Sequence, residues 1–96
     1  MAKPLGARAR VVFRGQVQGV GFRYTARRAA ESFAVTGYVQ NEPDGSVELV
    51  AEGERDEIEA FLGAVAREMA PYIRSREVTW SVATGEFHGF GVRHTW

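Results

Sequence analysis

The chain has 96 residues, of which 45% are hydrophobic, so it suits one compact domain over residues 1–96 that is stabilised by core packing. It contains no cysteine, which excludes disulfides, a thiolate nucleophile, zinc–thiolate sites and iron–sulfur clusters. Its formal net charge is zero, which argues against a generally basic nucleic-acid binder.

The charges are unevenly divided along the chain. Residues 1–30 hold seven Lys and Arg side chains and no acid, whereas residues 31–96 hold five Arg side chains and all twelve acids. A positive segment around a ligand loop would attract a small anion, although a solvated surface explains most of these arginines equally well.

The sequence shows no sign of export or membrane insertion. No stretch reaches the roughly 18 apolar residues of a membrane span, and the first eight residues lack the apolar core of a signal peptide. We therefore expect a cytoplasmic protein without a membrane partner. Balanced charge and an uninterrupted fold favour a monomer.

The first half of the chain begins with a short leader over residues 1–7, which contains Pro4 and Gly6. Apolar and arginine residues then alternate over residues 8–14, the pattern of a half-buried strand. Residues 15–21 include three glycines and predict a loop. Helical apolar spacing follows over residues 22–33.

The second half begins with an extended run that ends at Asn41. Turn residues 42–45 lead into a third strand over residues 46–52, so the two strands form a hairpin. The acidic residues Glu54, Asp56 and Glu57 and apolar spacing up to Pro71 predict a second helix. Alternation at residues 78–82 predicts a fourth strand, and residues 90–92 a short final one.

The order β-α-β-β-α-β predicts an α+β fold, a ferredoxin-like split β-α-β sandwich. In it, one mainly antiparallel sheet of four to five strands carries two helices on one face. The first two strands are parallel, with the third strand antiparallel between them. Their C-terminal ends share one sheet edge, so Arg23 and Asn41 can face one site.

The glycine-rich loop can point consecutive backbone N–H groups at an anion, beside the positive end of the helix dipole. Residues 15–21 match neither the Walker phosphate loop nor the dinucleotide-binding glycine pattern. Taken alone, such glycines also suit a simple tight connection between a strand and a helix.

Arg23 and Asn41 are the candidate functional side chains. Arg23 lies in the first turn of the predicted helix, where a cation opposes the helix dipole unless an anion binds there. Its guanidinium fork fits two phosphate oxygens. Asn41 could orient a water, or it could simply bond nearby backbone at the turn.

Two motifs carry a resemblance to a known family. Residues 15–23, GQVQGVGFR, are similar to the phosphate-loop signature of acylphosphatases. Residues 37–41, GYVQN, then 44–48, DGSVE, and Gly53 resemble the second signature of that family in the right order and spacing. The resemblance covers essentially the whole chain.

The resemblance implies hydrolysis of an acyl phosphate, such as 1,3-bisphosphoglycerate or carbamoyl phosphate, to a carboxylate and inorganic phosphate. It implies that Arg23 and the loop amides bind the phosphoryl oxygens and that Asn41 positions the attacking water. It implies no metal, no cofactor and no general base from the protein. The loop residues that this assigns to substrate binding are Gln16, Val17, Gln18, Gly19, Val20 and Gly21.

Three positions depart from the family pattern or are unusual. Ala34 stands where many relatives have glycine, which would cost about 1 kcal/mol if the position is left-handed. His94 follows Arg93 where the closing strand usually ends in Arg-Tyr, which leaves the terminal packing less defined. Glu42 lies beside the proposed water site, where it either tunes substrate choice or is a solvated turn residue.

Two other functions fit the same order of elements. An RNA-binding module is one, because residues 88–92, HGFGV, resemble an aromatic RNA-binding motif, but that motif belongs on the third strand, which here has no aromatic residue. A binding domain without catalysis is the other, and the presence of both Arg23 and Asn41 argues against it. We interpret His88 and His94 as surface or packing residues, and Trp80 and Trp96 as packing residues.

Overall fold

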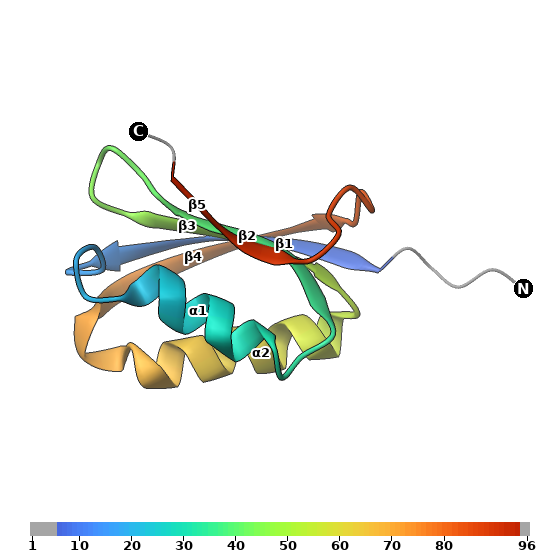
Figure 1. Cartoon of the computed structure of the whole chain (residues 1–96), viewed down its shortest axis with the longest axis horizontal. Helices are drawn as coiled ribbons and strands as arrows, with labels where there is room; N and C mark the ends of the chain where they lie inside the picture. The colour runs from blue at the N-terminus through green and yellow to red at the C-terminus, as the bar shows by residue number, and fades with distance from the viewer. Residues whose placement is uncertain (1–5, 95–96) are drawn as a thin grey trace, which may run out of the picture.

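The computed structural model describes residues 6–94, which form five strands and two α-helices (Figure 1). In chain order these are β1 (Ala7–Gly15), α1 (Phe22–Ala30), β2 (Val35–Asn41), β3 (Val47–Gly53), α2 (Arg55–Glu68), a short 3-10 helix (Ala70–Tyr72), β4 (Ile73–Val82) and β5 (Phe90–Arg93). The predicted leader falls mostly outside the described residues, and Ala7 already belongs to β1.

The sheet has the strand order β4-β1-β3-β2-β5. β3 is antiparallel to both β1 and β2, so β1 and β2 are parallel, while β5 pairs parallel with β2 at the sheet edge. Both helices cover one face of the sheet (Figure 1). The predicted ferredoxin-like fold is confirmed.

The main core lies between the sheet and the two helices. It is built from alternate residues of the inner strands and from the apolar stripes of the helices, which include Phe13, Phe22, Leu49, Ile58 and Phe61. All five side chains are at most 2% exposed. Phe13 and Phe22 contact each other with ring centroids 4.9 Å apart, so the residue that starts α1 is anchored against β1.

Strand β3 is buried on both faces, although its sequence alternates. On the face away from the helices, Glu48 and Glu52 are 7% and 4% exposed. Side chains from β1 cover them, because Arg10 Nε lies 2.6 Å from Glu48 and Arg8 Nη1 lies 3.0 Å from Glu52. The burial of two charged residues is thus compensated by ion pairs and hydrogen bonds.

Two element boundaries differ from the sequence prediction. Helix α1 ends at Ala30, because the next three N–H groups bond to carbonyls three residues back and tighten the chain into a turn. Phe33 lies beyond this helix end and packs against Phe61. Its apolar side chain therefore extended the helical spacing in the sequence past the true end of α1. Strand β4 begins at Ile73 rather than near residue 78, and its exposed, charged first half gives no alternating pattern.

Ala34 carries no left-handed strain. Among residues 6–94, no residue other than glycine has a positive φ angle. Its N–H donates to Glu57 Oε1 at 2.8 Å, which ties the end of the α1 turn to α2. The condition for a stability cost at Ala34 is therefore not met.

No helix between Gly6 and His94 has the length and apolar character needed to cross a membrane.

Glu52 fastens the segment before β5 to the middle of the sheet. One oxygen accepts bonds from Arg8, the Thr84 N–H and the Thr84 hydroxyl, and the other accepts from the Gly85 N–H at 2.9 Å. Burial acts to raise the pKa of Glu52, but these bonds outweigh burial and hold the pKa below the ordinary value of a glutamate. Glu52 therefore stabilises the fold above its ordinary pKa, and this contribution is lost as the pH falls through the lowered value.

The Glu52→Gln variant is expected to lower the free energy of unfolding by about 2 kcal/mol at pH 7, because an amide nitrogen faces groups that donate to the carboxylate. Urea denaturation at pH 7 and at pH 3 measures the effect, which should shrink at the lower pH as the wild-type carboxylate protonates. The exposed Glu59→Gln change is the control and should cost less than about 0.5 kcal/mol. A difference between wild type and Glu52→Gln that is equal at both pH values would contradict this role.

Candidate active site

The predicted loop connects the end of β1 to the start of α1. The buried side chains of Val17 and Phe22, 1% and 2% exposed, anchor it to the core at both ends. Gly19 and Gly21 both have φ of 78°, a left-handed backbone, and a Cβ at either position would meet no atom within 4 Å. Backbone conformation rather than crowding therefore requires glycine at both positions.

Helix α1 presents an N-terminus without a side-chain cap. Gly21 is the N-cap residue, and the first turn contains no acid. Helix α2 also lacks a side-chain cap, but Asp56 and Glu57 lie in its first turn and offset its dipole. The start of α1 carries the cationic Arg23 instead, so an anion there would interact favourably with both the dipole and the guanidinium.

Most of the loop N–H groups have no backbone acceptor. The Gln16 N–H donates to the Tyr72 carbonyl at 2.9 Å, so this amide is already paired. Within residues 6–94, no backbone carbonyl accepts from the N–H groups of residues 17–21. The amides that could line an anion site are thus those after Gln16.

Gln18 joins the loop to the turn between β2 and β3. Its Nε2 donates to the carbonyls of Glu42 and Ser46 at 2.8 and 2.9 Å. The turn is itself closed by the Glu42 N–H bonding to the Ser46 carbonyl, and by Asp44 accepting from the Ser46 N–H and hydroxyl. The sequence suggested Gln18 only as a source of a loop amide, and this cross-link by its side chain was not predicted.

Asn41 is the last residue of β2, directly before that turn. It pairs with Val47 in the β2–β3 ladder, and its neighbour Gln40 pairs with Arg93 of β5. The carboxylate of Glu42, the first residue of the turn, accepts a bond from Gln40 Nε2 of β2 at 2.8 Å. The backbone of Asn41 is therefore held in the β2–β3 ladder.

The loop, the turn after Asn41 and the end of β5 lie at the same end of the molecule, on the left of Figure 1. This arrangement follows from the parallel direction of β1, β2 and β5, whose C-terminal ends share one edge. Arg23 projects from α1 to this region, where its Nη1 lies 3.2 Å from the Arg93 carbonyl oxygen and 3.2 Å from His94 Nδ1.

Most described arginines of the positive segment, residues 1–30, form ion pairs. Arg8, Arg10, Arg14 and Arg28 pair with acids from the later part of the chain. Over the described residues, the arginines of the positive segment that form no ion pair are Arg23 and Arg27. Arg23, the arginine that we singled out from this segment, thus keeps a charge that no described acid pairs.

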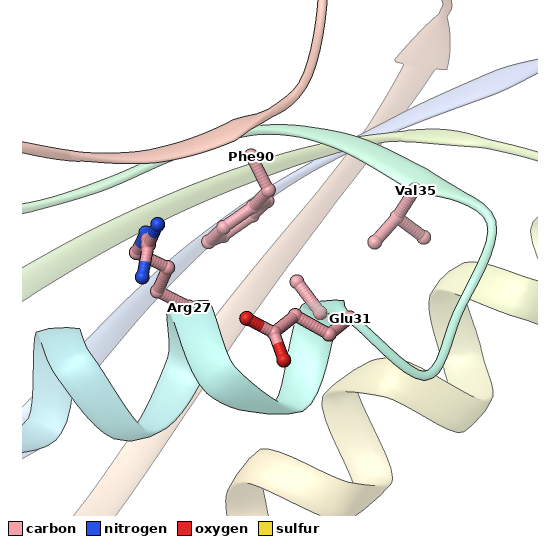
Figure 2. Close-up of a pocket in the computed structure, with 5 residues that line it drawn as sticks. Arg27, Glu31, Val35 and Phe90 are labelled. Atoms are coloured by element: carbon pink, nitrogen blue, oxygen red, sulfur yellow. The ribbon is translucent and has the colours of Figure 1, made fainter.

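A cavity of about 140 Å³ lies between α1 and the starts of β2 and β5. Arg27 of α1 and Glu31, the residue that follows α1, project into it toward Phe90, and Val35 lies on its far side (Figure 2). None of the predicted site residues lines it. It therefore lies apart from the loop and Asn41.

The structure also places Trp80 and His88, two of the other residues considered in the sequence. Trp80 is half-buried, and the Arg55 guanidinium lies 4.2 Å from its ring centroid, which agrees with the packing role. His88 is exposed before β5. Trp96 lies outside the described residues. No group of three or more acidic or histidine side chains within residues 6–94 is arranged to hold a metal ion.

Known proteins resemble this chain over most of its length. The family model described as acylphosphatase matches residues 9–92. The acylphosphatase of Salinibacter ruber is 48% identical over 80 residues, covering 82% of this chain and 84% of that protein. The acylphosphatase of Caldivirga maquilingensis is 43% identical over 91 residues, covering 93% and 96%.

A solved structure shows the same fold. The crystal structure of acylphosphatase from Bacillus subtilis superposes with a TM-score of 0.82 at 31% sequence identity, covering 92% of this chain and 99% of that one. The family match, the curated relatives and the shared fold agree, and the chain belongs to the acylphosphatase family.

Proposed function

We propose that this protein hydrolyses acyl phosphates by attack of water on phosphorus. The new bond joins the water oxygen to phosphorus, and the bond from phosphorus to the acyl oxygen breaks. The carboxylate leaves with the bonding electrons, and the phosphoryl group becomes inorganic phosphate. Family membership supports this reaction.

The observation that carries the proposal is Arg23 at the N-terminus of α1, a helix end with no acid in its first turn and no side-chain cap. A phosphoryl group beside the amides of residues 17–21 would face the positive end of the helix dipole and the guanidinium together. In phosphoryl transfer, such positioning and charge stabilisation supply most of the catalysis.

Asn41 is proposed to orient the water. A side-chain amide both donates and accepts hydrogen bonds, so it can fix a water relative to phosphorus, but it is not a base near neutral pH. No protein base is required, because a carboxylate is a good leaving group and the proton of the water can pass to the phosphate itself. The Gln18 cross-link supports the idea that the loop and Asn41 act as one rigid unit.

The proposal is tested by measuring release of benzoate from benzoyl phosphate in buffer containing EDTA. We expect full turnover, and at least about 100-fold lower kcat/KM on p-nitrophenyl phosphate, since neither Arg23 nor Asn41 serves as a general acid for a poorer leaving group near neutral pH. Activity that EDTA abolishes, or equal rates on the two compounds, would contradict the proposal.

A further inference from the structure

We propose that His94 is a positioning residue that orients Arg23 through its unprotonated Nδ1, so that anion binding weakens when His94 is protonated. This rests on the proposed role of Arg23 in holding the phosphoryl group. It concerns a side chain that differs from the usual ending of the family.

The contact has a defined donor and acceptor. Arg23 Nη1 lies 3.2 Å from His94 Nδ1 and 3.2 Å from the Arg93 carbonyl oxygen. Arginine has no acceptor, so the contact to His94 is a hydrogen bond only while Nδ1 carries a lone pair. In the neutral imidazole the proton is then on Nε2.

Both hydrogen bonds are made by the Nη1 atom of the Arg23 guanidinium. The opposite edge of Arg23, formed by Nε and Nη2, makes no hydrogen bond or ion pair to any of residues 6–94. A guanidinium binds two phosphoryl oxygens through such an edge. The end of β5 can therefore hold Arg23 from one side while an anion binds on the other.

The end of β5 is itself well fixed. Arg93 pairs with Gln40 in the parallel β2–β5 ladder, and its guanidinium stacks 3.7 Å from the ring centroid of Tyr38. The backbone of Arg93 is thus held in the sheet, and His94 follows it directly as an exposed residue after β5. Restricting a long arginine side chain before binding lowers the entropy that the anion must overcome.

Protonation of His94 would remove this bond. Histidine changes charge between about pH 5 and 8, and an imidazolium at this distance would also repel the guanidinium. The other charged or titratable groups on the elements that carry Arg23 and His94 are Tyr24, Arg27 and Arg28 on α1 and Arg93 on β5, and the neighbouring β2 and its turn add Tyr38 and Glu42. Residues 15–21 contribute none. Of the described acids, none forms an ion pair with Arg23 that could replace the contact.

The test uses inhibition of benzoyl phosphate hydrolysis by sulfate, which stays a dianion across the pH range. Asparagine can place its Oδ1 near the position of the imidazole Nδ1 and does not titrate, whereas phenylalanine offers no acceptor. At pH 8 we expect His94→Asn to keep the wild-type Ki within about twofold. His94→Phe should weaken sulfate about fivefold, the effect of losing one ordinary hydrogen bond.

At pH 5 we expect sulfate to bind wild type about fivefold more weakly than His94→Asn. The control His88→Asn, which changes the exposed histidine before β5, should follow wild type at both pH values. An unchanged Ki in His94→Phe at pH 8, or wild type binding sulfate as tightly as or more tightly than His94→Asn at pH 5, would overturn the proposal. Arg23→Ala distinguishes a failure of this inference from a failure of the proposed function. If that variant keeps turnover and sulfate inhibition, the proposed function itself fails.

Discussion

Replacing Arg23 by alanine is expected to lower kcat/KM for benzoyl phosphate by about 1,000-fold, because the change removes the charged donor that faces the phosphoryl group in the transition state. Arg23→Lys should recover only a small part of the loss, since an ammonium keeps the charge but not the planar fork. Steady-state kinetics with benzoyl phosphate measure both variants.

Arg27→Ala is the matched control for Arg23, because Arg27 lies one turn later on α1 and also forms no ion pair within the described chain. Its kcat/KM should stay within about threefold of wild type, since only long-range attraction is lost. Equal losses in Arg23→Ala and Arg27→Ala would show that the charge of α1, rather than a specific contact, supports turnover.

Replacing Asn41 by alanine is expected to lower kcat by about 100- to 1,000-fold, because the attacking water loses its orientation. The backbone pairing of Asn41 with Val47 does not depend on its side chain. Gln40→Ala is the matched control, since Gln40 is also an amide side chain on β2 but bonds to Glu42. We expect it to keep most of the turnover, and a loss as large as in Asn41→Ala would contradict a specific role for Asn41.

The sequence predicted the fold well where buried residues recur with the period of a strand or of a helix. The alternation in β1 and the helical spacing in α2 indicated both elements, and the order of elements indicated which strand ends share an edge. Strand β4 was only half predicted, since Arg74 and Arg76 lie on an exposed edge and carry no apolar signal. Burial of Glu48 and Glu52 was missed because it depends on arginines from another strand.

The candidate site was predicted in part. The glycines, the first-turn arginine and the strand-end asparagine are local features with a chemical meaning, and the family motifs covered the same residues. The contacts of Gln18 and His94 could not be predicted, because they join residues 24 to 71 positions apart. His94 was interpreted as a surface or packing residue, since an isolated histidine near a chain end gives no signal of its partner.

The division of roles between Arg23 and Asn41 is the central claim, and binding of inorganic phosphate to the Asn41→Ala protein tests it most directly. Isothermal titration calorimetry with wild type, Asn41→Ala and Arg23→Ala provides the comparison. We predict that Asn41→Ala binds phosphate within about twofold of wild type although its turnover is lost, and that Arg23→Ala binds at least about tenfold more weakly. Equal loss of phosphate affinity in the two variants would contradict the account.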